Sequence, residues 1–146
     1  MNDSSKSSGS LLAHGAAQTA EILAQVAFNA DGLVAAVLQD ASSNEFLMMA
    51  WMDETAFLRT LETGKACFYS RSRKAAWMKG ESSGHLQIVR EVLLDCDGDV
   101  VLLKVDSIGG IACHTGRRNC FFRKLENGGW VTQFDPIKSQ TEIYGE

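Results

Sequence analysis

The apolar residues of this chain fall into short runs, and the spacing within each run predicts a helix or a strand. Residues 19–28 repeat apolar positions near the helical period, so we expect a short amphipathic helix there. Residues 33–39 and 45–52 are apolar stretches separated by the polar segment DASSN. This arrangement is typical of a β-hairpin with a longer loop.

Asp53 is the expected N-cap of a second helix, because an aspartate at this place can accept a hydrogen bond from the first helical turn. The helix should run to about Glu62 and be followed by Gly64, which suits the left-handed conformation found after helix ends. Residues 66–70 follow as a predicted strand. The predicted inner face of the helix consists of Ala56, Phe57, Thr60 and Leu61.

The second half of the chain predicts two further hairpins. Residues 86–94 and 100–105 are apolar runs joined by the sequence DCDGD, whose Asp-Gly pair is a strong tight-turn signal. Residues 120–125 and 130–134 form the last predicted hairpin, around ENGG. Together these elements indicate an α+β fold with mostly antiparallel pairing and a few short helices.

Length and composition fit one domain with a real core, because the chain has 146 residues of which 45% are hydrophobic. We assign the domain to residues 18–135, with a flexible N-terminal tail at 1–17 and a C-terminal tail at 136–146. The net charge of −4 argues against a general binder of nucleic acids or membrane surfaces. A pocket with a few Arg and Lys residues could still hold a phosphorylated small molecule.

The cellular location follows from what the sequence lacks. No apolar run approaches the roughly 20 residues of a membrane span, and the polar N-terminus has no signal region. We therefore expect a cytoplasmic protein, in which the four cysteines stay reduced and serve metal binding or catalysis before disulfides.

Three carboxylates crowd the predicted turn at DCDGD, namely Asp95, Asp97 and Asp99. They repel one another unless solvent or a cation relieves them, and Mg²⁺ prefers oxygen ligands of this kind. An Asp-rich solvated turn is the competing interpretation. If the segment stays extended, Cys96 points to the face opposite its aspartate neighbours and could serve a second, softer metal; otherwise it is a small buried hydrophobe.

A second cluster lies in ACHTGRRNCF, where Cys113 and Cys120 flank a loop that contains His114. Thiolates favour zinc, and a third cysteine ligand, Cys96, would leave the fourth position open for water, as in catalytic zinc sites. His114 could then handle protons, and His85 is a weaker candidate for this role. Cys67 lies in an apolar run and is assigned to the core.

The most basic internal stretch is 71–85, RSRKAAWMKGESSGH. Arg and Lys pair with phosphates, Ser and Gly amides can surround them, and a Trp offers a stacking face for a base. A solvated surface loop with its Trp in the core explains the same residues equally well. The candidate substrate-binding residues are Arg71, Arg73, Trp77, Lys79, Ser82, Ser83 and, beside the cysteines, Arg117.

Taken in this order, these segments resemble the phosphoribosyl-AMP cyclohydrolase family of histidine biosynthesis. The resemblance covers about residues 31–125, through the stretches LMMAWMDETAFLRTLETGKACFYSRSR, WMKGESSGH, LDCDGDVVLLKV and ACHTGRRNCFF. Small departures from the family pattern are Met78, where a His or another polar residue often follows the Trp, and Asn119, where Ser commonly precedes the last Cys. Nothing of domain size follows Phe134, so the chain should lack the fused pyrophosphohydrolase of many relatives.

The resemblance implies hydrolytic opening of the purine ring of 1-(5-phosphoribosyl)-AMP at the N1–C6 bond. It implies Mg²⁺ at Asp95, Asp97 and Asp99, and zinc at Cys96, Cys113 and Cys120. It also implies a compact α+β domain with a curved antiparallel sheet, in an intertwined homodimer. Each subunit would hold one zinc ion, whose cysteine ligands come from both subunits.

Two rivals remain. A nucleoside or base deaminase also uses zinc on a purine or pyrimidine, but its H-x-E and P-C-x-x-C signatures are missing from this sequence. A non-catalytic zinc module would need a fourth protein ligand, for which His114 is the nearest candidate. A nucleic-acid binder ranks behind both, given the acidic balance.

Overall fold

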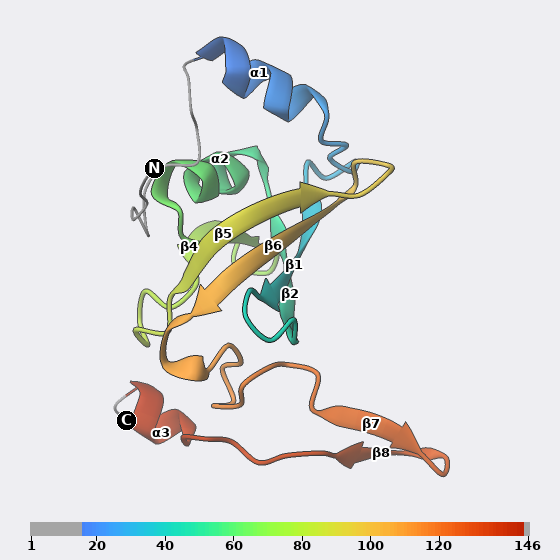
Figure 1. The fold of residues 1–146 in the computed structure, drawn as a ribbon, viewed down its shortest axis with the longest axis vertical. Coiled ribbons are helices and arrows are strands. Elements are labelled where there is room, and N and C mark those ends of the chain that lie inside the picture. The colour runs from blue at the N-terminus through green and yellow to red at the C-terminus, as the bar shows by residue number, and fades with distance from the viewer. Residues whose placement is uncertain (1–15, 145–146) are drawn as a thin grey trace.

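Strand β6 (Val100–Ser107) lies inside the main sheet and pairs with a strand on each side. The computed structural model describes residues 16–144, and its main sheet has the order β2-β1-β6-β5 (Figure 1). β6 runs parallel to β1 (Val34–Asp40) and antiparallel to β5 (Gln87–Leu94). β1 pairs in turn with β2 (Phe46–Met52) in an antiparallel hairpin, as the sequence predicts.

Two smaller sheets complete the fold. β3 (Cys67–Ser70) pairs with β4 (Ala75–Met78), and β7 (Arg123–Glu126) pairs with β8 (Gly129–Thr132), both antiparallel. The predicted final hairpin is therefore confirmed, although its strands are shorter than expected. The β7–β8 hairpin projects away from the main sheet at the lower right of Figure 1. The described residues therefore form one α+β domain, in which most strand pairs are antiparallel and the β1–β6 pair is parallel.

Helix α2 (Glu54–Thr63) confirms the predicted caps and inner face. The Asp53 carboxylate accepts a hydrogen bond of 2.8 Å from the Ala56 amide, and Gly64 follows the helix with a φ of 73°. Only a residue without a Cβ adopts such a left-handed φ at no steric cost. The four residues predicted for the inner face, Ala56, Phe57, Thr60 and Leu61, are all buried.

The hydrophobic core lies between α2 and the main sheet and continues into β3. Phe68 is fully buried, and its ring centroid lies 5.1 Å from that of Trp77, which is half-buried at the core edge. Cys67 is buried as predicted. The basic segment is thereby attached to the core through its Trp.

The predicted bounds of the first helix are wrong, and two short elements are not predicted by the sequence. Helix α1 (Ala16–Ala24) begins three residues earlier than predicted and ends before Phe28, because the chain turns at residues 25–27 to pair with the turn before β6. Residues 71–85 contain β4, whose pairing with β3 the polar sequence does not reveal. The predicted C-terminal tail contains helix α3 (Gln140–Tyr144).

Most of the predicted N-terminal tail, residues 1–17, lies outside the described residues, and α1 begins at its end. No helix within residues 16–144 is long and apolar enough to cross a membrane.

Thr60 joins α2 to β3 and offers a test of this packing. Its hydroxyl accepts a hydrogen bond of 3.0 Å from the Cys67 amide and lies 2.9 Å from the Ala56 carbonyl. Thr60→Val should therefore lower the free energy of unfolding in urea by about 1–3 kcal/mol, because a buried amide loses its acceptor. The exposed Thr55→Val is the matched control and should change it by less than about 0.5 kcal/mol; equal effects would contradict the assignment.

Candidate functional site

Cys113 and Cys120 lie on two legs of one loop that folds back on itself. The 3₁₀ turn η1 (Ile108–Gly110) leads into it after β6. The Cys113 amide donates to the Arg117 carbonyl at 3.1 Å, and the Ala112 amide donates to the Arg118 carbonyl at 3.2 Å. The second leg is fixed to the main sheet, because the Cys120 amide donates to the Leu47 carbonyl at 2.7 Å. The loop thus brings together two cysteines that are separated by six intervening residues.

The two thiols lie close enough to interact. Burial raises the pKa of Cys120 to about 12, and the neighbouring Cys113 thiol adds to the increase, although Cys120 retains exposed surface. Cys113 is buried, and its sulfur accepts a hydrogen bond of 3.0 Å from the Thr115 hydroxyl. Two adjacent thiols, one of them partly desolvated, are suitable ligands for a soft or borderline cation.

Lys79 lies beside this pair and brings the basic segment to it. Burial lowers the pKa of Lys79, while the negative charge that Cys120 and Cys113 would carry as thiolates acts in the opposite direction. His85 lies in the same region. Burial lowers the pKa of His85, and the charges of Lys138 and Lys79 lower it further. Lys79 thus interacts electrostatically with the two predicted cysteines and with His85.

His114 is exposed, and its carbonyl accepts a hydrogen bond of 3.3 Å from the Gln140 side chain. The His85 ring fits against Gly109, where an added Cβ would lie 2.6 Å from the ring carbon Cδ2. His85 is therefore more confined than His114.

Two hollows lie along the predicted substrate-binding segment, and Arg73 and Trp77 border both. One has a volume of about 510 Å³ and is also lined by Trp51, Tyr69 and Arg71. The other has a volume of about 150 Å³ and is also lined by Lys79, Ser82, Ser83 and Tyr144. Six of the seven predicted substrate-binding residues therefore border one of these hollows. The exception is Arg117, whose Nε donates to the Phe134 carbonyl at 2.8 Å and whose guanidinium lies 3.9 Å from the Phe122 ring centroid.

The three aspartates lie at the β5–β6 turn, at the upper right of Figure 1. The Asp95 carboxylate accepts hydrogen bonds from the amides of Asp99 and Val100, at 3.0 and 3.2 Å. A hydrogen bond with the Asp95 side chain and the charge of that carboxylate raise the pKa of Asp99. The turn is not extended, since the Gly98 amide donates back to the Asp95 carbonyl at 3.1 Å. The condition on which Cys96 was expected to face away from the aspartates is therefore not met.

The acidic turn and the cysteine loop lie at opposite ends of β6 (Figure 1). Cys96 precedes this strand and Cys113 follows it, and eight residues of strand span roughly 26 Å. Within residues 16–144, no three His, Cys, Asp or Glu side chains converge as a metal site. One copy of the chain therefore does not bring the three predicted zinc ligands together.

Comparisons with known proteins identify the family. The model of the phosphoribosyl-AMP cyclohydrolase family matches residues 48–122. A phosphoribosyl-AMP cyclohydrolase of Nitrosospira multiformis is 55% identical over 124 residues, which are 85% of this chain and 95% of the relative. Those of Marinobacter nauticus and Chromobacterium violaceum are 54% and 52% identical, over 84% and 86% of this chain and 89% and 96% of their own lengths. The chain belongs to the phosphoribosyl-AMP cyclohydrolase family.

Every residue predicted for the site lies within the range that the cyclohydrolase family model matches, since these residues run from Arg71 to Cys120. The structure adds residues that sequence analysis missed. Glu45 and Asn119 form hydrogen bonds beside Cys120, and Lys138 and Tyr144 reach the site from the C-terminal segment. No local sequence signal reveals contacts between positions so far apart.

The C-terminal segment, residues 136–144, is attached to the cysteine loop at Gly116. The Gly116 carbonyl accepts hydrogen bonds from the amides of Ile137 and Lys138, at 2.8 and 3.4 Å. Gly116 has a φ of +90°, and a Cβ there would lie 1.7 Å from the Lys138 carbonyl oxygen. Only glycine allows this approach.

Gly116→Ala should therefore release the C-terminal segment from the loop. We expect hydrogen exchange at the Ile137 and Lys138 amides to accelerate by at least about tenfold, because each loses its protected acceptor. Gly129→Ala is the control, since a Cβ at Gly129 meets nothing within 4 Å. Unchanged exchange in Gly116→Ala would show that the segment does not depend on this contact.

Proposed function

We propose that this chain opens the adenine ring of 1-(5-phosphoribosyl)-AMP by hydrolysis of the N1–C6 bond, a step of L-histidine biosynthesis. The product is the phosphoribosyl-formimino imidazole carboxamide ribotide. The observation that carries the proposal is the 55% identity to a phosphoribosyl-AMP cyclohydrolase across 95% of that relative's length. The reaction belongs in the cytoplasm, where free cysteines such as Cys113 and Cys120 stay reduced.

The chemistry requires a nucleophile at C6 and protons that move to and from the ring. The ribose on N1 makes the ring amidine electron-poor, so that water can add at C6. The water oxygen becomes the carboxamide oxygen and the N1–C6 bond breaks. Of the two water protons, one goes to N1 as it leaves and the other to the exocyclic N6, which becomes the carboxamide nitrogen. His114 and His85 are the candidates for moving these protons, and imidazole suits the task at neutral pH.

Zinc is the proposed cofactor, one ion for each subunit. Cys113 and Cys120 fit as two of its ligands because their thiols are already adjacent. Cys96 is the proposed third ligand and would come from a second copy of the chain, because it lies at the other end of β6. A zinc ion with three thiolate ligands and an open position activates water at neutral pH.

Mg²⁺ is the second proposed metal, at Asp95, Asp97 and Asp99. Carboxylate oxygens are the ligands that a hard cation prefers, and a cation would relieve the repulsion by which the Asp95 charge raises the pKa of Asp99. The three side chains do not converge in one described copy, so the ion would have to draw them together. The ion would help to hold a phosphate of the substrate.

A homodimer would complete the site, and two apolar surfaces support it. The end of β5 exposes Val92, Leu93 and Leu94 by 36–42%. They border a groove of about 420 Å³ whose other apolar residues are Ile22, Val26, Phe57, Leu61 and Val101. The β7–β8 hairpin exposes Leu125 and Trp130 by 61% and 69%. Exposed apolar surfaces of this kind are typical of interfaces.

The substrate carries two phosphates, and the basic segment would bind them. Arg71, Arg73 and Lys79 supply the charge, and Ser82 and Ser83 supply hydroxyl groups at the smaller hollow. Trp77 borders both hollows and offers a ring for stacking on the purine. Arg117 is the weakest of the predicted contacts, because its guanidinium is already held by Phe134 and Phe122.

The direct test follows the ultraviolet absorbance of 1-(5-phosphoribosyl)-AMP mixed with the purified protein, zinc and Mg²⁺. We expect a spectral change that a strong zinc chelator abolishes and added zinc restores. Cys113→Ala should lose both zinc and at least about 99% of turnover, as changes at metal sites commonly do. Cys67→Ala is the control, because this cysteine is buried in the core away from the loop.

An active, zinc-free Cys113→Ala variant would contradict the metal assignment alone. A zinc-loaded protein that leaves the substrate spectrum unchanged would contradict the catalytic function. A zinc-binding module that closes its coordination sphere with a fourth protein ligand would then be the better description, and the absence of an exchangeable water on the metal would support it.

A further inference from the structure

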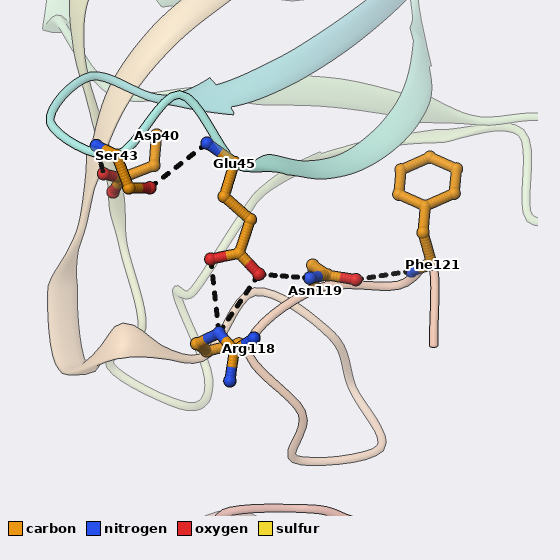
Figure 2. A network of polar contacts seen from close by, with 6 residues as sticks. All are labelled: Asp40, Ser43, Glu45, Arg118, Asn119 and Phe121. Carbon is orange, nitrogen blue, oxygen red and sulfur yellow. Dashed lines mark hydrogen bonds and ion pairs between the residues drawn. The ribbon is translucent and has the colours of Figure 1, made fainter. Parts of the chain in front are cut away.

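Glu45 connects the β1–β2 turn to the leg of the loop that carries Cys120 (Figure 2). Arg118 Nε donates to both carboxylate oxygens of Glu45, at 3.2 and 3.1 Å. The Asn119 side-chain amide donates to Oε2 of the same carboxylate. The two donors are the residues that directly precede Cys120, although Glu45 lies more than 70 positions earlier in the chain. A distant carboxylate thus holds the two residues that precede a cysteine.

Asn119 passes this contact on to the backbone around Cys120. Its side chain is buried, with 6% of the residue exposed, and its Oδ1 accepts a hydrogen bond of 2.8 Å from the Phe121 amide. The Cys120 amide, between these two residues, donates to the Leu47 carbonyl. Asn119 is therefore connected to Glu45 and Cys120 to Leu47, while Phe121 is connected to Glu45 through Asn119. Figure 2 shows the chain of contacts from Glu45 through Asn119 to the Phe121 amide.

The turn that carries Glu45 is itself well held. The Asp40 carboxylate accepts hydrogen bonds from the amides of Ser42 and Ser43, at 3.0 and 2.8 Å. The Ser43 hydroxyl accepts from the Glu45 amide at 3.1 Å, and the Asp40 amide donates to the Glu45 carbonyl at 2.8 Å. The turn is anchored to the main sheet, because the Ala41 amide donates to the Val105 carbonyl at 2.8 Å. Glu45 is therefore a fixed point for the loop.

The first leg of the loop carries Cys113. The hydrogen bonds at Arg117 and Arg118 join it to the second leg, which carries Cys120. Arg118 takes part in both sets of contacts, since its carbonyl accepts from Ala112 and its side chain donates to Glu45. The relative position of the two thiols consequently depends on where Glu45 holds the second leg.

We infer that Glu45 is a positioning residue for Cys120, which acts through Arg118 and Asn119 and sets the geometry between the Cys120 and Cys113 thiols. The use of this geometry for zinc rests on the proposed function. Removal of a group that orients a metal ligand without contacting the metal commonly lowers metal affinity by about tenfold to a hundredfold.

The test compares Glu45→Gln, Asn119→Ala and the double variant with the wild-type protein. Glutamine keeps the size of the side chain but turns one acceptor into a donor, which then faces another donor. Asp106→Asn is the matched control, because the Asp106 carboxylate also accepts a hydrogen bond from an arginine, Arg90 Nε at 2.6 Å, but this pair joins β6 to β5. The readouts are zinc affinity by chelator competition, the absorption spectrum of the Co²⁺-substituted protein, and thermal unfolding.

We expect both single variants to bind zinc about tenfold to a hundredfold more weakly and to change the Co²⁺ spectrum. The double variant should lose little more than the worse single variant, because both act through one contact. Asp106→Asn should match the wild type. A role in stability alone would lower the unfolding midpoint and leave the zinc affinity and the Co²⁺ spectrum at wild-type values, which would overturn the inference.

A metal-free readout separates this inference from the proposed function. In the metal-free protein, the rate at which a mild oxidant joins Cys113 to Cys120 reports how the thiols are held, and it should fall severalfold in both variants. If the wild type binds no zinc, the metal assignment fails and these rates alone decide the role of Glu45. Oxidation at the wild-type rate in both variants would overturn the positioning role of Glu45. Asn119→Ala carries the same test if Glu45→Gln does not fold.

Discussion

Strand β6 determines where the chemistry of this protein can lie. Its parallel pairing with β1 and antiparallel pairing with β5 fix it inside the main sheet, so that its two ends cannot approach each other. The acidic turn with Cys96 precedes the strand, and the loop with Cys113 and Cys120 follows it. A site that uses all three cysteines must therefore combine one end of this sheet with the opposite end of another copy.

The cysteine loop contains little regular structure of its own, and distant parts of the chain hold it in place. Glu45 and Leu47 hold its second leg, and the C-terminal segment packs on Gly116. Lys79 reaches it from the segment after β4. Loops that carry function are commonly positioned by a rigid scaffold in this way. Lys79, which borders the smaller hollow beside Trp77, also interacts electrostatically with the two thiols.

Much of the fold was predictable because local signals agreed with the packing. Asp53 caps the start of α2 and Gly64 follows its end, as predicted, and the Asp-Gly pair forms the β5–β6 turn. Strand β4 was missed because no local apolar pattern encodes its pairing with β3. Helix α3 was missed because its five residues are too few to show a helical repeat of apolar positions. At the candidate site, residue types predicted Cys113 and Cys120 as partners, and the fold brings their thiols close enough to interact. The role inferred for Glu45 depends on a contact across more than 70 residues, which no local pattern contains.

The most direct test of a site divided between two copies mixes two inactive variants. Cys96→Ser and Cys113→Ser should each be inactive alone, since each lacks one zinc ligand in every site. In a mixed dimer one site would receive an intact Cys96 from one subunit and an intact Cys113 from the other. Random subunit exchange should therefore restore about a quarter of the wild-type activity. A mixture of exchanged dimers that stays inactive, or a fully active Cys96→Ser variant, would contradict the account.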